Sequence, residues 1–391
     1  MESYDVVSVG GGIAGSIAAR LAAENGLTSL LVERAQTPRE KPCSGIQFGY
    51  FEKLVGRTIP KDKLCSNEIF NMNIITPDEK IFKGKMKVLN FWRSTFDRWL
   101  NDLAVEEGAV FQDRTRLVEY KKLDGGYQLN LQTGSESQEV FTRYLVAADG
   151  MYSRIRKKLR PGDFLQKAPG GAMNYYCAGE GDLDPHALYM VNIKAYAPIM
   201  FAWIYKKDDL WVIGTGAEHD LKDYADRFFE YVCSKYNFQG EIVRKEGFAS
   251  PLKFGVYLGD ENSLLCGDAA GLLDAYRGVA MDNAAISARL AVQAILDAKK
   301  SGNPAISYYS QKMNRMKRQM EANEIKRVAK FTSDETLAAS FTPGQVLMDG
   351  LKMVTANAAN RVLPPERVIT LPISAVQYSS TEILWILIKT I

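Results

Sequence analysis

The sequence is poor in the residues that most often bind metals or act as general bases. Its 391 residues include only two histidines, His186 and His219, and five cysteines, none of which belongs to a Cys-x-x-Cys pair. Both histidines stand in polar stretches, where a solvated side chain is expected. These features argue against a zinc centre and against a histidine-based catalytic triad, and we predict no metal site.

The sequence also has no large excess of charge of one sign and no long apolar run. A net charge of +3 is too small to indicate a nucleic-acid partner. No run approaches the roughly 18 apolar residues of a membrane span. The nearest is ILWILI at residues 383–388, which is interpreted either as a core segment or as a contact with a membrane surface. The odd number of cysteines, with no secretory leader before the first apolar run, favours a reduced, cytoplasmic chain.

A glycine-rich turn dominates the beginning of the chain. Residues 6–35, VVSVGGGIAGSIAARLAAENGLTSLLVERA, have the order strand, tight turn, helix, strand. Gly10 permits the turn, Gly12 lets a pyrophosphate approach the backbone, and Gly15 allows the helix to pack close to the sheet. Glu33 ends the second strand, where an acid can bind a ribose. We therefore expect a dinucleotide to be bound by Gly10, Gly12, Ile13, Ala14, Gly15, Glu33 and Arg34.

The rest of the chain alternates between helical and extended patterns. Helical spacing predicts a helix over residues 91–108 and another over 281–302. Residues 170–253 are mostly of β type, interrupted by a helical stretch over 224–236. A basic helical stretch follows at 308–331, interpreted as a solvated face or as a helix lying on a membrane. The domains are expected to be interleaved along the chain.

Two further motifs indicate which dinucleotide is bound. Asp149 and Gly150 end a strand in LVAADGMYSRIRKKL, and Gly267 and Asp268 end another in LLCGDAAGLLDAYRGVAMDNAA. An aspartate at such a position can accept a hydrogen bond from a ribityl or ribose hydroxyl. The helix that follows can hold negative charge at its N-terminus, such as the charge on a reduced flavin. The residues at that helix start are Gly278, Val279, Ala280 and Met281.

The three motifs, in this order, resemble the FAD-dependent flavoproteins of the glutathione-reductase type, in their aromatic-hydroxylase-like branch. The resemblance covers roughly residues 3–298. It implies bound FAD and an α/β fold with a Rossmann-type FAD-binding domain, an interleaved and mostly antiparallel β-sheet substrate domain, and a helical C-terminal region. The FAD-binding domain is assigned to 1–65, 91–165 and 255–302, the substrate domain to 66–90 and 166–254, and the helical region to 303–391.

Shorter motifs narrow this resemblance to the geranylgeranyl reductases. EKPCSGIQ places Cys43, Ser44 and Gly45 where that family has a cysteine-small-glycine motif beside the flavin, and RSTFDRWL implies that Arg93 lies near the cofactor. PIMFAWIYKK is similar to a family strand in the substrate lobe. The implied activity is the reduction of C=C bonds in polyprenyl chains. An apolar wall for such a chain would be formed by Phe201, Trp203 and Tyr205.

Several positions depart from the family pattern. Ala275 replaces a proline before the flavin loop, and residues 278–281 read Gly-Val-Ala-Met instead of Gly-Glu-Gly-Ile. In the strand motif, Ala202 replaces a glycine, Tyr205 a phenylalanine and Lys206 a proline. These changes bear on the substrate more than on FAD. Arg277, just before the flavin loop, is interpreted either as a positive charge near the ring or as an exposed loop arginine.

The sequence leaves the reaction open among three functions. The first is an FAD-dependent reductase, with Cys43 either as the catalytic proton donor or as an inert thiol. The second is a monooxygenase, hydroxylase or halogenase on the same scaffold, and the third is a non-catalytic prenyl-binding escort protein. No second strand, G-x-G-x-x-G turn and helix is found for NADPH, so the electron donor is either NADPH or a ferredoxin-type redox partner. The expected partners are a hydrophobic small molecule and, peripherally, a membrane.

Overall fold

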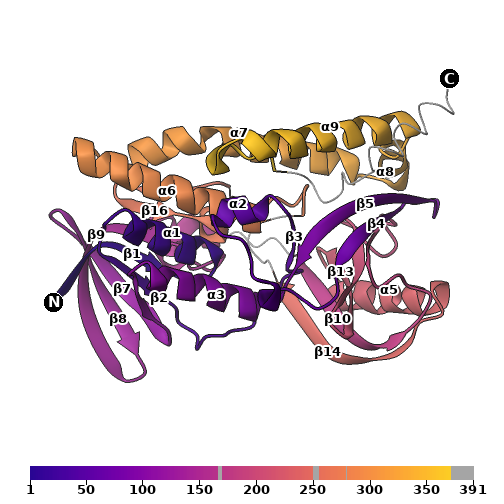
Figure 1. Ribbon diagram of the computed structural model, residues 1–391, viewed down its shortest axis with the longest axis horizontal. Coiled ribbons are helices and arrows are strands. Elements are labelled where there is room, and N and C mark those ends of the chain that lie inside the picture. Colours follow the sequence, from indigo (N-terminus) through magenta and orange to yellow (C-terminus); the bar gives the residue numbers. More distant parts are fainter. Residues whose placement is uncertain (166–169, 250–254, 279, 371–391) are drawn as a thin grey trace.

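The computed structural model describes residues 1–165, 170–249, 255–278 and 280–370. Two β-sheets lie side by side along the long axis of the molecule, and a layer of helices runs across both (Figure 1). The mixed α/β architecture that the sequence predicts is confirmed.

Sheet A carries the glycine turn. Among the described residues it has eight strands, with the order β15-β16-β9-β1-β2-β6, and the β7–β8 hairpin is attached through β9. The pairs β16–β9, β9–β1, β1–β2 and β2–β6 are parallel. The strands are β1 (Glu2–Val9), β2 (Ser29–Val32), β6 (Val110–Gln112), β7 (Thr115–Leu123), β8 (Gly126–Thr133), β9 (Glu136–Ala147), β15 (Gly259–Asp260) and β16 (Ser263–Leu265).

β1 lies in the interior of sheet A, between β9 and β2, and its apolar residues are buried on both faces. Val6 and Val7 are fully buried, and α1 (Ile13–Glu24) covers one face with alanines and isoleucines. Near-continuous apolar runs are typical of parallel strands covered on both sides. The helix that the sequence predicts after the glycine turn is confirmed.

Sheet B is mostly antiparallel. Among the described residues it has eight strands in the order β14-β10-β13-β12-β11-β4-β5-β3, and β11 pairs with β4 in parallel. The strand at 46–48 comes from the segment assigned to the FAD-binding domain, yet it pairs with β5 of this sheet. The strands are β3 (Ile46–Phe48), β4 (Ile69–Ile75), β5 (Ile81–Asn90), β10 (Gly171–Glu180), β11 (Ala187–Val191), β12 (Ala202–Lys207), β13 (Leu210–Ala217) and β14 (Gln239–Ala249).

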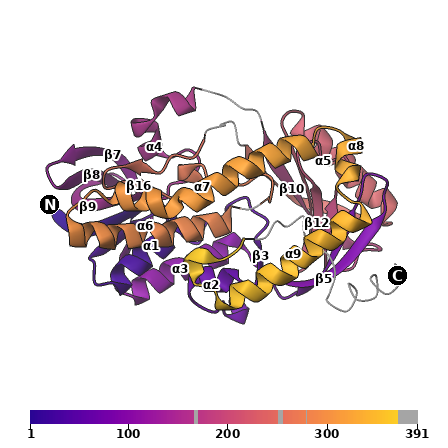
Figure 2. The same ribbon diagram turned by 90° about the horizontal axis from the view of Figure 1, so that it is seen from above.

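The helices cover both sheets. α5 (Leu221–Lys235) packs on one face of sheet B through Phe228 and Val232, whereas Phe331, Leu337 and Phe341 from the C-terminal region pack on the opposite face. α6 and α7 lie against sheet A and continue toward α9 over sheet B (Figure 2). The remaining helices are α2 (Phe51–Val55), α3 (Arg93–Glu106), α4 (Arg154–Leu159), α6 (Met281–Ser301), α7 (Ala305–Lys330), α8 (Asp334–Ala339) and α9 (Pro343–Val362). Short 3-10 turns are η1 (Lys61–Lys63), η2 (Pro161–Phe164), η3 (Gly267–Ala270) and η4 (Pro365–Arg367).

Within the described ranges, no helix is both long enough and apolar enough to cross a bilayer. The apolar run at residues 383–388 lies outside these ranges.

Candidate FAD site

Two glycines of the N-terminal turn are required by close backbone contacts. Gly10 follows β1 with φ = +110°, and a Cβ atom there would lie 2.4 Å from the Ala148 carbonyl oxygen. A Cβ atom at Gly15 would lie 1.9 Å from the Gly10 carbonyl oxygen. Any larger residue at either position would force β1, β9 and α1 apart, so the tight packing of these three elements depends on both glycines.

Gly12 has a different environment, because cationic side chains and not backbone atoms border it. It is the N-cap residue of α1, followed by Ile13 and Ala14 in the first turn. A Cβ atom at Gly12 would lie 3.2 Å from Nη2 of Arg39 and 4.0 Å from Nη2 of Arg93. A helix N-terminus beside two guanidinium groups is a site suited to a doubly charged anion such as a pyrophosphate.

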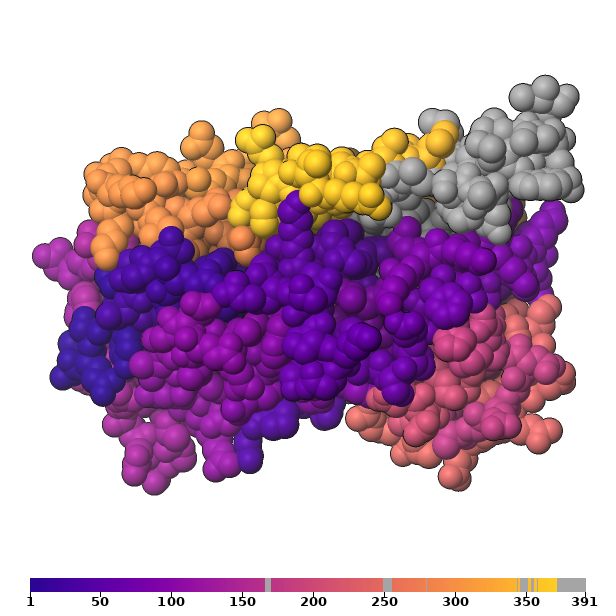
Figure 3. All heavy atoms as spheres, viewed as in Figure 1, coloured from indigo at the N-terminus to yellow at the C-terminus, as the bar shows by residue number. Residues whose placement is uncertain are grey.

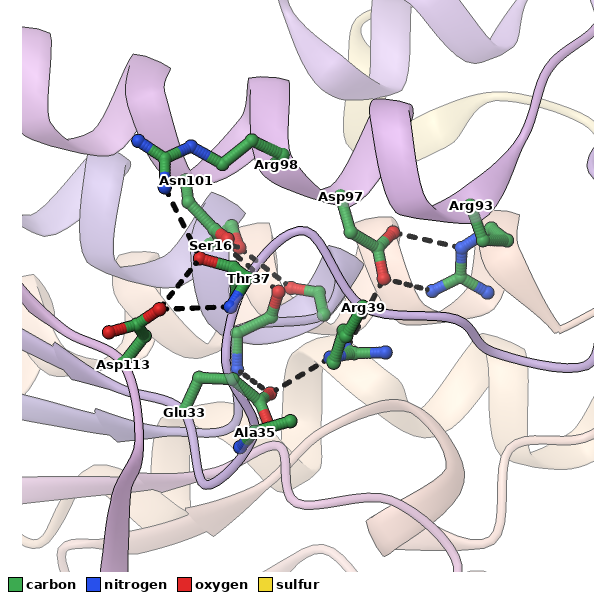
Figure 4. Close-up of polar contacts among 12 residues, drawn as sticks. Ser16, Glu33, Ala35, Thr37, Arg39, Arg93, Asp97, Arg98, Asn101 and Asp113 are labelled. Carbon is green, nitrogen blue, oxygen red and sulfur yellow. Dashed lines mark hydrogen bonds and ion pairs between the residues drawn. The ribbon is translucent and has the colours of Figure 1, made fainter. Parts of the chain in front are cut away.

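A network of four charged side chains holds these guanidinium groups in place (Figure 4). Arg93 binds Asp97 one turn further along α3 through two hydrogen bonds of 2.8 Å. Nη2 of Arg39 lies 3.2 Å from Asp97, and Nε of Arg39 lies 3.2 Å from Glu33. Burial alone would lower the pKa of Arg93, but the Asp97 carboxylate and Cys43 beside it raise that pKa above its ordinary value. Arg93 is therefore cationic at every relevant pH.

Glu33 is also tied directly to the glycine turn. Its carboxylate accepts hydrogen bonds from the backbone N–H of Gly11 at 2.8 Å and of Ala35 at 2.9 Å. Asn101 of α3 donates to the carbonyl oxygen of Gly11 at 3.0 Å and to the hydroxyl of Ser16 at 2.7 Å. These contacts fix the turn between β2, α1 and α3. Arg34, predicted to bind the cofactor, has an exposed side chain that no hydrogen bond or ion pair joins to the described residues.

Sequence reasoning missed Arg39, Asp97 and Asn101. Asp97 and Asn101 follow Arg93 at intervals of four residues, so the helical pattern of α3 already placed all three on one face. Arg39 lies in an irregular segment, where no periodic pattern points to it.

The two aspartate motifs end neighbouring strands of sheet A. Asp149 follows β9, and its carboxylate accepts a hydrogen bond from the Arg154 amide at 2.8 Å; burial raises the pKa of Asp149. Gly150 next to it has φ = +79°. Gly267 and Asp268 follow β16 in η3, and Lys41 Nζ lies 3.4 Å from the Asp268 carboxylate. The Lys41 contact brings the loop that contains Cys43 to this edge of the sheet.

The cysteine loop contacts the start of α6. The Cys43 thiol lies 3.8 Å from the Met281 thioether sulfur, across 238 positions of sequence. Ala280 is the N-cap residue of α6, and Val279 lies outside the described residues. Gly278 has φ = +68° and lies in the loop before α6, which begins at Met281 as the helical spacing predicts. The predicted residues Cys43 and Met281 are therefore neighbours in space.

Sheet B also reaches this loop. The Tyr205 hydroxyl donates to the Ser44 carbonyl oxygen at 3.2 Å, and Nζ of Lys207 donates to the Phe91 carbonyl oxygen at 2.5 Å. A Cβ atom at Gly45 would lie 1.9 Å from that same carbonyl oxygen, so the loop and the start of α3 are packed closely. Burial lowers the pKa of Lys207 to about 8 and raises that of Tyr205 well above its ordinary value.

The predicted substrate residues form a row along β12. Phe201 precedes the strand, and its ring lies 3.2 Å from the position of a Cβ atom at Gly278. Trp203 follows at a ring-centroid distance of 6.3 Å and donates from Nε1 to Asn174 at 2.8 Å. Because side chains alternate along a strand, Phe201, Trp203 and Tyr205 share one face, which packs in the apolar cluster with Phe331 and Phe341.

Arg277 differs from the exposed loop arginine that was one interpretation of the sequence. Its side chain is only 3% exposed. It donates to Asp274 at 2.6 Å, to Asp282 at 3.3 Å and to Asn283 at 3.0 Å. The interpretation as an exposed loop residue is therefore wrong, because two carboxylates of the same chain compensate the buried charge.

These residues fit FAD in three respects. Gly12 leaves an opening beside two guanidinium groups at a helix N-terminus. Glu33 closes β2 next to the turn. Two aspartates, Cys43 and the start of α6 meet at the adjoining edge of sheet A, next to the aromatic row of sheet B. The pyrophosphate would be held by the glycine turn with Arg39 and Arg93.

The sequence itself matches a known family model over residues 3–174, described as an FAD binding domain. Among curated proteins, Protein CbrA of Escherichia coli (strain K12) is 27% identical over 288 residues, which cover 70% of this chain and 79% of CbrA.

Solved flavoproteins share the fold. A geranylgeranyl bacteriochlorophyll reductase-like protein from Thermoplasma acidophilum superimposes with a TM-score of 0.78 at 23% identity, covering 100% of both chains. The flavin-dependent brominase Bmp2 gives 0.69 at 16% identity over 100% of both chains. Aklavinone-11 hydroxylase, solved with FAD and aklavinone, gives 0.60 at 16% identity over 79% of this chain and 65% of the hydroxylase.

Together with the geometry of the site, these comparisons show that residues 3–174 form an FAD-binding domain and that the chain has the fold of flavin-dependent proteins, with FAD as its cofactor.

Proposed function

We propose that this protein reduces C=C bonds of a prenyl-type or other hydrophobic substrate. The observation that carries the proposal is the continuity between the aromatic row of β12 and the cofactor loops. Phe201 touches the Gly278 loop, and Tyr205 hydrogen-bonds the Ser44 carbonyl oxygen. An apolar wall that ends at the flavin loops suits a substrate that offers a hydrocarbon chain and no charge.

The wall is buried and hydrogen-bonded to the backbone at the cofactor end, and it is apolar farther away. Tyr205 and Lys207 are each 1% exposed, and both donate to backbone carbonyl oxygens of neighbouring segments. Phe201 and Tyr205 continue into the apolar cluster under the C-terminal helices, which includes Leu337 and Phe341. This arrangement would orient a chain and exclude water from its reacting bond.

Reduction of a C=C bond needs a hydride equivalent at one carbon and a proton at the other. When bound and reduced, FAD supplies the hydride equivalent. The proton has to come from the chain or from water, and Cys43 is the candidate donor. Its thiol contacts the weak acceptor Met281 Sδ, whereas the Tyr205 hydroxyl and the Lys207 ammonium group already donate to carbonyl oxygens. Arg93 beside Cys43 would stabilise the thiolate that remains.

The test uses protein reduced with dithionite under anaerobic conditions. Adding a polyprenyl alcohol, a polyprenyl lipid or a prenylated quinone should restore the oxidised flavin spectrum and give a product with two more hydrogens per reduced bond. Cys43→Ala should slow this step, whereas Cys177→Ala, a buried thiol on the other face of sheet B, should not. The proposal is wrong if no hydrophobic alkene reoxidises the flavin.

The competing functions give different results in the same experiment. The likeness in fold to a brominase and to aklavinone-11 hydroxylase supports oxygen-dependent chemistry as the second candidate. That candidate is correct if turnover needs oxygen and the product gains an oxygen or a halogen atom. Tight binding of the prenyl compound without any product, from protein that contains flavin, would instead indicate an escort protein.

Two partners belong to this proposal. Electrons would come from NADPH or from a ferredoxin-type protein, and stopped-flow reduction with each donor separates the two.

The substrate would be collected from a membrane surface touched by the helical layer. α7 carries seven lysines and arginines against two glutamates, and Ile325 and Val328 on it are 73% and 55% exposed.

A further inference from the structure

A cavity of about 550 Å³ lies between α6, α7 and residues 364–370. Residues on its wall come from the middle of both helices and from the turn η4 that follows α9. None of the described residues that line it belongs to the glycine turn, the cysteine loop or the aromatic row of β12. The cavity is thus a second site with its own lining.

One part of the wall is apolar. Ile286 and Leu290 project from α6, Met316 and Met320 from α7, and Val368 from the segment after η4. Ile286, Leu290 and Val368 are buried, and the two methionines are half-buried. Methionine side chains are unbranched and adaptable, so they accommodate a hydrocarbon chain without a fixed shape.

The remaining wall is mostly polar and carries more basic than acidic side chains. Lys312 and Glu366 line the cavity but are already paired, with Asp297 at 2.9 Å and Arg289 at 3.2 Å. Arg315 and Arg367 are exposed, and no ion pair or hydrogen bond joins either to a residue of the described ranges. Two guanidinium groups therefore remain available for a ligand beside the apolar wall.

We propose that this cavity binds a single-chain amphiphile with an anionic head group, such as an alkyl phosphate or a fatty carboxylate. Arg315 and Arg367 pair with the head, since a guanidinium group matches the geometry of a phosphate or carboxylate. The chain lies against Ile286, Leu290 and the methionines. The proposal does not depend on the proposed reductase activity, because it involves other residues.

The inner wall connects the cavity with the FAD site. Arg277 and Asn283 line the cavity and hydrogen-bond each other at 3.0 Å. Both flank Met281, which contacts Cys43. The guanidinium group of Arg277 already donates to Asp274, Asp282 and Asn283. The head group is therefore assigned to the exposed Arg315 and Arg367. Arg277 is accordingly left unchanged in the test.

Isothermal titration of the FAD-loaded full chain tests the proposal, with dodecyl phosphate as the probe below its micelle concentration. One binding site is expected. Arg315→Gln/Arg367→Gln should weaken binding by about tenfold or more, as expected for lost charged hydrogen bonds. Met316→Trp, which narrows the cavity, should also weaken it. The matched control is Lys317→Gln/Arg318→Gln, which removes the same charge from exposed positions of α7 that do not line the cavity.

Four results would overturn the proposal. They are no saturable binding of dodecyl phosphate, equal affinity for dodecanol, equal affinity for inorganic phosphate, and an equal loss of affinity in the control variant. Equal dodecanol binding would mean that the head is not recognised, and equal phosphate binding would mean that the chain is not. Flavin content and thermal unfolding of each variant establish that it is folded before titration.

Discussion

At the scale of single residues, the same added methyl group meets opposite surroundings at Gly12 and Gly15. At Gly15 it would overlap the Gly10 carbonyl oxygen, whereas at Gly12 it meets only the ends of two arginine side chains, which can move. Gly15→Ala should therefore lower the free energy of unfolding by about 1–3 kcal/mol or more. Gly12→Ala should fold normally and retain less FAD, because its methyl group occupies the approach to the backbone.

Thermal unfolding and the flavin-to-protein absorbance ratio separate these effects. Gly162→Ala is the control, since nothing lies within 4 Å of a Cβ atom there and its φ is not in the left-handed region. Full FAD occupancy in a folded Gly12→Ala variant would remove the glycine turn from the cofactor site.

The buried Lys207 should make stability depend on alkaline pH. Its pKa is lowered to about 8 by burial, against about 10.4 in an unfolded chain. Between these values the unfolded state binds more protons, so this contribution raises the free energy of unfolding as pH rises from about 8 to about 10, by at most about 3 kcal/mol. Lys207→Met should lack this rise, as measured by urea unfolding across that range.

Lys206→Met is the matched control, because Lys206 precedes Lys207 in β12 but is only half-buried. The expected pattern is a difference between wild type and Lys207→Met that grows with pH, and no such trend for Lys206→Met. Parallel pH profiles for all three proteins would mean that Lys207 is charged in the fold at pH 9.

At the scale of elements, the start of α6 depends on a buried charge cluster. Arg277 compensates Asp274 and Asp282, and burial already raises the pKa of Asp282. Removing the cation with Arg277→Met should lower the free energy of unfolding by about 3–5 kcal/mol at neutral pH. The cost should shrink at pH 5, because the folded state then binds a proton on Asp282, whose pKa is already raised by burial and rises further without the Arg277 cation.

Denaturant unfolding at both pH values checks this prediction, with Arg318→Met, an exposed arginine of α7, as the control. FAD content should fall with Arg277→Met, since α6 positions Met281 against Cys43. An unchanged stability, or a larger loss at pH 5 than at pH 7, would show that the two carboxylates are solvated.

Elements whose signals are local could be predicted from the sequence, and those with distant partners could not. The β1–α1–β2 unit was predictable because an apolar run, three glycines and an alanine-rich helix follow each other within 35 residues. The start of α6 at Met281 was predictable from its helical spacing, whereas the positive φ of Gly278 in the loop before it was not. The burial of Arg277 was equally hidden, because a loop arginine next to two aspartates looks solvated until the fold encloses it.

The candidate site follows the same rule. Its glycines and aspartates stand at the ends of strands, where short sequence motifs identify them. Arg39 and Lys41 pair with Glu33 and Asp268 from a segment that has no periodic pattern. The contact between Cys43 and Met281 joins positions 238 residues apart. Only the interleaving of three chain segments at one edge of sheet A produces that contact, and it has no local signal.

At the scale of the whole molecule, the helical layer forms a band along one edge (Figure 3). α7 and α9 lie over the two sheets, and among their described side chains the large apolar residues Ile325, Val328, Leu351 and Val362 are exposed. Together with the basic side chains of α7, this composition is typical of a surface that rests on anionic lipid. The alternative is a solvated helix whose basic residues bind nothing.

Vesicle co-sedimentation at low and high salt distinguishes the two. Binding to anionic vesicles should be lost at high salt, because exposed charges are screened there, and it should be weak on neutral vesicles. Each lysine or arginine near the surface contributes about 1 kcal/mol, so Lys317→Gln/Lys326→Gln should reduce the affinity by roughly tenfold or more. The control Arg116→Gln/Lys121→Gln removes equal charge from β7, which lies well below α7 in Figure 1. Equal binding by both double variants would assign the attraction to overall charge, and no binding to any vesicle would mean that the substrate reaches the FAD site from solution or from a carrier protein.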